Sequence, residues 1–339
     1  MKKILRLLFI VILLLAGVLY WLLFTSATRF DEKSKYVHVY EQNTAESEMM
    51  EQLSGSSLVN NTGLFRFVAS RLNVWKRIKP GRFEITKGQS LMSIVRMLRN
   101  NKQVPSKLVI NKLRVPEDLA KLIGRNFRTD SATAMQFLTN KDSLQKLGVD
   151  SDSWLTLVIP DTYIMNWNTS TFKILSRLKS EQEDFWTAER KQKAINLGLT
   201  PEQVYALASI VEEETNANQE KGNIASVYMN RISKGMALGA DPTIKFALKN
   251  FALRRIHFGD LQVASPYNTY RNKGLPPGPI CTPSKITIDA VLDAPRTDYL
   301  FFVASAELNG THHFSSTYAE HQQYAKTYQE ELNKRGINK

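Results

Sequence analysis

Apolar and polar positions divide the chain into an apolar N-terminal stretch and a long region of short amphipathic segments. Residues 7–24 carry no charged side chain. At about 1.5 Å per residue, a helix of this length is long enough to cross most of a hydrocarbon core of about 30 Å. Lys2, Lys3 and Arg6 precede the stretch and are expected to stay in the cytoplasm, because basic flanking residues set the orientation of a membrane segment.

A cleaved signal peptide is the alternative interpretation of this N-terminus. Thr25, Ser26 and Ala27 could form a small-residue cleavage site, but the apolar run is longer than the usual signal core of about 7–15 residues. The length favours an uncleaved, single-pass anchor of the inner (cytoplasmic) membrane over residues 1–27. Either interpretation places the remaining chain in the periplasm or another extracytoplasmic space.

The next region, residues 28–103, is predicted to be a stalk followed by a small subdomain of short strands and amphipathic helices. The pattern predicts a strand over Tyr36–Tyr40 and a second strand after the turn at Pro80 and Gly81. Ser90 is a suitable N-cap for a helix that follows. This arrangement resembles LysM-type glycan-binding modules.

Residues 104–339 are predicted to form a larger mixed α+β domain. Its first part, about 104–198, reads as a strand over 107–113, short helices, an apolar strand-like stretch over 154–167 that Pro160, Asp161 and Thr162 interrupt, and a long charged helix over 171–197. Its second part, about 199–339, holds the candidate chemistry described below. The predicted fold class is therefore α+β, with one N-terminal transmembrane helix, a small LysM-like subdomain and a larger catalytic domain.

Composition narrows the function classes. The 339 residues are 43% hydrophobic, which excludes a disordered chain, and the single cysteine, Cys281, excludes a disulfide scaffold. A net charge of +13 suits an acidic partner. Because the chain is expected outside the cytoplasm, nucleic acid is a poor candidate, and anionic lipid or a carboxylate-bearing polymer remains.

Motifs for metal or nucleotide chemistry are not found in the sequence. His312, His313 and His321 do not have the spacing of known zinc-binding motifs, so no metal site is predicted. Glycine-rich phosphate loops and serine-esterase motifs are also absent from the sequence, so no cofactor is expected.

Three consecutive carboxylates end a strongly predicted helix. Thr200 is an N-cap followed by Pro201, and the helix runs into Glu212, Glu213 and Glu214. At about 100° per residue, Glu214 lies on the same row as the apolar positions of the helix. A carboxylic acid among apolar neighbours favours its neutral form, as a general acid requires. The same run would also fit a solvated, acidic end of a surface helix.

A second group of residues suits the recognition of sugars. Asp241 and Thr243 follow a turn, and Tyr267, Asn268 and Tyr270 lie on a loop that precedes a proline-rich segment. Aromatic rings can cover the apolar faces of sugars, while amide and hydroxyl groups bind sugar hydroxyls. The alternative is a rigid turn that contains core tyrosines.

Together these motifs resemble the YceG-like endolytic murein transglycosylases. The residues that carry the resemblance are Ala208–Thr215 (ASIVEEET), Ala225–Arg231 (ASVYMNR), Asp241–Thr243 (DPT), Tyr267–Tyr270 (YNTY) and Gly274–Ile280 (GLPPGPI). In that family the last glutamate of the first motif is the catalytic acid, which here is Glu214. We expect Asp241 to orient the substrate or the loop backbone. Thr243, Tyr267, Asn268 and Tyr270 are expected to line the saccharide groove, and Glu212 is counted with these substrate-binding residues.

The resemblance also implies a reaction. The enzyme would be a lyase that cleaves the β-1,4 bond between N-acetylmuramic acid and N-acetylglucosamine within peptidoglycan strands, leaving 1,6-anhydro ends. It would terminate glycan elongation beside peptidoglycan synthases of the division machinery. Two alternatives are a non-catalytic, membrane-anchored peptidoglycan-binding or division scaffold, and a muramidase in which Asp241 activates water.

Overall fold

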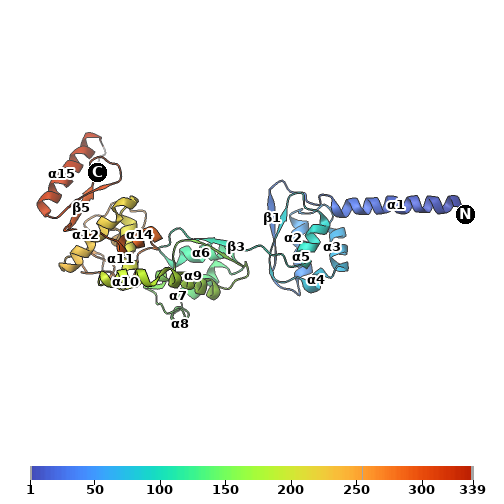
Figure 1. The fold of residues 1–339 in the computed structure, drawn as a ribbon, viewed down its shortest axis with the longest axis horizontal. Helices are drawn as coiled ribbons and strands as arrows, with labels where there is room; N and C mark the ends of the chain where they lie inside the picture. Colours follow the sequence, from blue (N-terminus) through green and yellow to red (C-terminus); the bar gives the residue numbers. More distant parts are fainter. Residues whose placement is uncertain (1, 254, 337–339) are drawn as a thin grey trace. The chain divides into compact units, whose positions relative to one another are not determined.

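The computed structural model describes residues 2–253 and 255–336 and has a mixed α+β architecture (Figure 1). The chain separates into two compact units. The first unit contains residues 1–108, 124–130 and 163–170, and the second contains residues 109–123, 131–162 and 171–339. Each unit has its own hydrophobic core.

The first unit combines a long N-terminal helix, the antiparallel strand pair β1–β2 and several shorter helices. Strand β1 pairs with β2, and Val37 lies opposite Phe83 in this register. The elements in chain order are α1 (Lys2–Phe24), β1 (Ser34–Val39), α2 (Ala45–Gly55), α3 (Thr62–Arg71), α4 (Val74–Arg77), β2 (Gly81–Thr86) and α5 (Leu91–Arg99).

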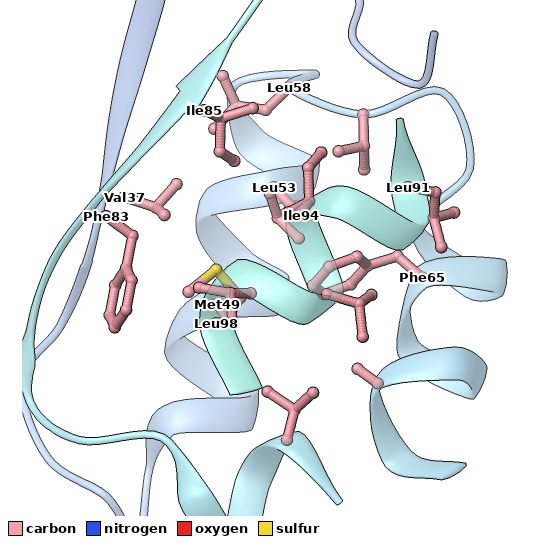
Figure 2. Close-up of a cluster of buried hydrophobic side chains, with 14 of the residues drawn as sticks. Val37, Met49, Leu53, Leu58, Phe65, Phe83, Ile85, Leu91, Ile94 and Leu98 are labelled. Carbon is pink, nitrogen blue, oxygen red and sulfur yellow. The ribbon is translucent and has the colours of Figure 1, made fainter. Parts of the chain in front are cut away.

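The core of the first unit forms between the strand pair and the helices α2, α3 and α5, as Figure 2 shows. Alternate residues of β1 and β2 point inward because successive side chains of a strand face opposite sides. Helix α5 buries Leu91, Ile94 and Leu98 at helical spacing, and the Ser90 hydroxyl accepts a hydrogen bond from the Ser93 N–H. The predicted N-cap at Ser90 is therefore confirmed.

Helix α1 is the one described helix that is long and apolar enough to cross a membrane. It has a mean hydropathy of 2.9 over its most apolar window, and its side chains there are not buried. The chain after α1 is held by the first unit, since Ala27 and Phe30 are buried in its core. The Ala27 N–H donates to the Gln89 carbonyl at 3.0 Å.

Most of the remaining chain folds into the second unit. Two of its strands, β5 and β6, form an antiparallel pair. Strand β3 pairs with β4, and most residues of these two strands belong to the first unit. The elements in chain order are β3 (Ser106–Val109), α6 (Pro116–Asn126), α7 (Ser131–Thr139), α8 (Lys141–Gln145), β4 (Thr162–Met165), α9 (Thr171–Phe185), α10 (Ala188–Asn196), α11 (Pro201–Glu214), α12 (Lys221–Ser233), α13 (Asp241–Ala247), α14 (Lys285–Leu292), β5 (Phe301–Ala304), β6 (His312–Ser315) and α15 (Tyr318–Lys334).

Two elements differ from the prediction. The long charged helix over 171–197 is two helices, α9 and α10, because Thr187 adopts an extended conformation and caps α10 by accepting from the Arg190 N–H. The strand-like stretch over 154–167 contains a 3-10 turn at Trp154–Leu157, and only its second half forms strand β4. In the charged run the cap residue Thr187 ends one helix and begins the next, and in the apolar run the 3-10 turn takes the place of the first half of the strand.

Helix α11 lies in the core of the second unit. All eight residues from 204 to 211 are buried, so the helix is enclosed on every side rather than on one face. The buried Tyr205 hydroxyl donates to the Val158 carbonyl at 2.5 Å and also lies 2.9 Å from the Leu155 carbonyl. Because the core holds α11 so closely, the position of its C-terminal end is well defined.

Candidate active site

The three carboxylates lie at the C-terminal end of α11, and the N-terminal end of this helix is firmly capped. The Thr200 hydroxyl accepts from the Gln203 N–H, and the Gln203 side chain accepts from the Thr200 N–H, which completes the predicted capping box. The helix ends at Glu214. The three carboxylates then enter three different environments, because successive residues of a helix point about 100° apart.

Glu212 points toward α14 and is bound as a carboxylate. Its Oε2 accepts from Lys221 Nζ at 3.2 Å and from Ser284 Oγ at 3.0 Å, and it also accepts from the Thr287 hydroxyl. Burial alone would raise the pKa of Glu212, but these hydrogen bonds and the Lys221 charge outweigh it and hold the pKa below its ordinary value. Lys221 is itself buried.

Glu213 turns away from Glu212 and pairs with two cations. Arg114 Nε and Nη2 donate to its two oxygens at 3.1 and 2.9 Å, and Lys112 Nζ lies 3.2 Å from Oε1. Burial opposes the charged form, but the two cations outweigh it, so the pKa of Glu213 is also lowered. Glu212 and Glu213 are therefore carboxylates that hold the end of α11 in place.

Glu214 has no such cation bonded to it in the described part of the chain. Its Oε1 accepts one hydrogen bond, from the Tyr228 hydroxyl at 2.5 Å. Burial raises the pKa of Glu214 to about 7, and the negative charge of Asp241 adds to this, although the Tyr228 hydrogen bond and the charges of Lys245 and Arg231 act in the opposite direction. Near neutral pH this carboxyl can therefore both donate and accept a proton.

Helix α12 supplies two residues of the site to which sequence reasoning gave no role. Tyr228 is buried against Phe302 and orients Glu214 through its hydroxyl. Arg231, one turn later, donates to the carbonyls of Leu300 and Leu238 at 2.7 and 2.5 Å. Their spacing of three residues places both on one side of α12, and this spacing is the signal that could have identified them.

Asp241 and Tyr270 lie together at the surface of the site. The Tyr270 hydroxyl donates to Asp241 Oδ1 at 2.5 Å, and Tyr270 is 39% exposed. Partial burial, together with the hydrogen bond to Asp241 and the charge of Asp241, raises the pKa of Tyr270, so this hydroxyl stays protonated. Asp241 is the first residue of α13 and is exposed.

The other three predicted substrate-binding residues are buried. Thr243 and Asn268 have no exposed surface, and Tyr267 is 8% exposed. The Thr243 hydroxyl binds the Ala240 carbonyl at 2.6 Å and lies 2.9 Å from the hydroxyl of Thr269, which sequence reasoning did not single out. These contacts join the loop before Tyr270 to the start of α13.

Asn268 and Tyr267 fix the same loop from within. The Asn268 amide donates to the carbonyls of Leu261 and Val263 at 2.9 Å each, and its oxygen accepts from the Tyr270 N–H at 3.0 Å. The Tyr267 hydroxyl donates to Asp152 at 3.2 Å. The structure therefore brings Asp241 and Tyr270 together at the surface, on a support made by Thr243, Tyr267 and Asn268.

The histidines near the C-terminus have protein partners. His312 Nδ1 lies 3.0 Å from Glu220 Oε2, and His313 stacks on Tyr324 with ring centroids 4.6 Å apart. His321 stacks on Phe301. Over residues 2–253 and 255–336, no group of three or more His, Cys, Asp or Glu side chains has the arrangement of a metal site.

Comparisons with known proteins show which family the chain resembles. The YceG-like family profile matches residues 37–327. The chain is 30% identical over 244 residues to an endolytic murein transglycosylase of Bacillus subtilis, covering 72% of this chain and 64% of that protein. It is 26% identical over 305 residues to an endolytic murein transglycosylase of Streptococcus pneumoniae, covering 80% of this chain and 54% of that protein.

A solved structure shows the same fold. The crystal structure of a YceG-like protein of Listeria monocytogenes superposes with a TM-score of 0.60 at 25% identity, over 86% of this chain and 99% of that one. The chain spans between about half and two thirds of the length of the two curated relatives. Because the family profile matches residues 37–327, which are most of the chain, the chain belongs to the YceG-like family.

Proposed function

We propose that the protein is an endolytic murein transglycosylase that cleaves the β-1,4 bond between N-acetylmuramic acid and N-acetylglucosamine within peptidoglycan strands. The observation that carries the proposal is Glu214, a carboxyl whose pKa is raised to about 7 beside two carboxylates that are held ionised. Family membership and the names of the two curated relatives support the same activity.

In the proposed reaction Glu214 serves first as acid and then as base. Its proton passes to the glycosidic oxygen while the bond from that oxygen to C1 of the muramoyl sugar breaks. The Glu214 carboxylate then takes the proton of the muramoyl 6-hydroxyl, and the 6-oxygen bonds to C1 to close a 1,6-anhydro ring. The Tyr228 hydroxyl, bound to Oε1, stabilises the carboxylate that exists between these two steps.

Substrate contact is proposed for the exposed pair of Asp241 and Tyr270. The Tyr270 ring offers an apolar surface for a sugar face, and Asp241 can accept hydrogen bonds from sugar hydroxyls. Thr243, Tyr267 and Asn268 contribute by holding this pair, since their own side chains are buried. Glu212 contributes by fixing α11 to α14.

Helix α1 is proposed to be an uncleaved single-pass anchor in the inner membrane, with the N-terminus in the cytoplasm and both units outside. Its length and hydropathy support this role. The first unit is proposed to be LysM-like and to bind glycan. A tethered enzyme would reach recently made strands beside peptidoglycan synthases and would terminate their elongation there.

Mass spectrometry of the fragments released from purified peptidoglycan tests this proposal. Full-length protein in detergent is expected to release fragments that end in 1,6-anhydro-muramic acid. Reducing ends would point instead to a muramidase in which Asp241 activates water. Binding of folded protein without release of fragments would favour a non-catalytic scaffold.

Removal of the Tyr228 hydroxyl is expected to move the pH profile of cleavage upward. Without this donor the Glu214 carboxylate is less stable, so its pKa rises above about 7 and the protonated acid persists to higher pH. A hydrogen bond to a charged group is worth enough for a shift of about one pH unit. The rate of fragment release by Tyr228→Phe between acid and alkaline pH measures the shift.

Asp241→Asn is expected to move the same profile in the opposite direction. The negative charge of Asp241 raises the pKa of Glu214, so its removal lowers that pKa, and the basic limb of the profile falls at lower pH. The shift should be less than about one pH unit because Asp241 is exposed and its charge is screened by water. Cleavage should persist, and its complete loss would contradict a supporting role for Asp241.

A further inference from the structure

The positive charge of the first unit is concentrated in one part of its sequence. Residues 62–102, which span α3, α4, β2 and α5, contain ten lysines and arginines but a single acidic residue, Glu84. Figure 1 shows α3 and α5 on the side of the first unit from which α1 emerges. A basic surface beside an apolar helix is typical of contact with anionic lipid.

A cavity of about 480 Å³ lies along α5 beside the end of α1. We call it the α5 groove. Its wall combines apolar and polar side chains from the end of α1 and from α5 with the residues just after it: Phe24, Met92, Met97, Ser93, Arg96 and Lys102. Groups that can contact acyl chains and groups that can bind phosphate therefore line one cavity.

Backbone contacts hold the α5 groove at the exit point of α1. Ser26 forms an isolated β-bridge with Ser90, the N-cap of α5, and the Asn60 N–H donates to the Ala27 carbonyl at 2.7 Å just before α3 begins. If α1 crosses the hydrocarbon core as far as Phe24, the start of α5 lies at the level of the lipid headgroups.

The two cations of the α5 groove are available to a ligand. Arg96 and Lys102 are both exposed, and neither forms an ion pair with any residue among 2–253 and 255–336. Phosphate is the anion that such a pair binds best, and arginine can bind it in a bidentate manner.

We propose that the α5 groove binds the headgroup of an anionic phospholipid in the leaflet from which α1 emerges. Arg96 and Lys102 bind the phosphate, while Phe24 and Met92 contact the glycerol and the start of the acyl chains. The bound lipid would fix the first unit against the membrane surface. This inference rests on the anchor role proposed for α1 and is independent of the chemistry proposed for Glu214.

Native mass spectrometry of the full-length protein in detergent tests the proposal. With added phosphatidylglycerol, one lipid should stay bound at concentrations where phosphatidylcholine is not retained. Arg96→Glu with Lys102→Glu should weaken phosphatidylglycerol retention by about tenfold or more, because each cation near an anionic lipid contributes about 1 kcal/mol and about 1.4 kcal/mol is tenfold in affinity.

The matched control is Lys76→Glu with Lys79→Glu. It changes the net charge of the first unit by the same amount at two exposed lysines that do not line the α5 groove. This variant should retain phosphatidylglycerol within about twofold of the natural protein. Equal weakening in both double variants would show a general charge effect and would overturn the proposed site.

Glycerol 1-phosphate separates a lipid site from a site for free phosphate. It should not displace phosphatidylglycerol, because it lacks the acyl chains that contact Phe24 and Met92. Displacement at similar concentrations would overturn the lipid assignment. A thermal melt of the Arg96 and Lys102 double variant that matches the melt of the natural protein shows that the variant is folded. Loss of lipid retention in a folded variant is a result distinct from any failure of the activity proposed for Glu214.

Discussion

Glu214→Gln is expected to lower the release of 1,6-anhydro fragments by about 10²–10⁴-fold, which is the range that general acid–base catalysis contributes. The amide cannot donate the proton that the leaving oxygen requires, and it cannot accept the proton of the 6-hydroxyl. Its carbonyl oxygen can still accept the Tyr228 hydrogen bond, so the packing around the site is preserved. Fragment release by mass spectrometry measures the effect, with a thermal melt to show that the protein is folded.

Glu213→Gln is the matched control, since it makes the same chemical change one residue earlier. Glu213 is paired with Arg114 and Lys112, and its carboxylate has no direct part in the proposed reaction. Cleavage should therefore stay within about tenfold of the natural protein. Equal losses in the two variants would mean that any change at the end of α11 disrupts the site. Normal cleavage by Glu214→Gln would move the acid to another carboxyl, such as Glu212.

Glu212→Ala is expected to have the largest effect on stability, a loss of about 3 kcal/mol or more in the free energy of unfolding. The substitution leaves the Lys221 ammonium buried without its counter-ion, and it removes the acceptor for Ser284 and Thr287. Denaturant unfolding followed by tryptophan fluorescence measures the loss, because Trp154 and Trp186 lie in the second unit.

A double substitution tests the reason for this loss. Glu212→Met with Lys221→Met removes both charges and fills the same space with apolar atoms, so it should recover much of the stability lost in Glu212→Ala. Glu213→Ala should cost about 1 kcal/mol or less, since Arg114 and Lys112 are more exposed than Lys221 and can turn toward water. If the double substitution is as unstable as Glu212→Ala, the buried charge is not the cause.

Local signals in the sequence were enough to predict several elements of the fold. The cap residues Ser90 and Thr200 begin α5 and α11 as expected, and alternation placed the strands after Tyr36 and Gly81 within two residues. The break between α9 and α10 was missed, because the charged surfaces of both helices form one continuous pattern and only Thr187 interrupts it. A cap within a charged run is a weak signal in a single sequence.

In the candidate site, the sequence pattern indicated Glu214 but not the residues that bind its two neighbours. The helical row set Glu214 apart from its two neighbours, and in the structure the pKa of Glu214 is raised while the pKa values of Glu212 and Glu213 are lowered. The partners of those neighbours, Arg114 and Lys221, lie far from the site in sequence or in another element, so no local spacing indicated them. The apolar row of α11 predicted burial on one face of the helix. In the structure core residues surround this helix on every side.

The position of Glu214 as the last residue of α11 has a consequence for stability. The backbone dipoles of a helix sum to a partial negative charge at its C-terminus, where anions are unfavourable. The raised pKa of Glu214 adds to this effect. Neutral pH lies above the pKa of a glutamate in the unfolded chain, so the unfolded chain gives up the proton more easily and the folded protein is less stable. The Glu214 carboxyl therefore lowers the stability of the folded protein. Glu214→Gln should lose activity but melt at a higher temperature than the natural protein. This is the result expected where function is maintained at the expense of stability.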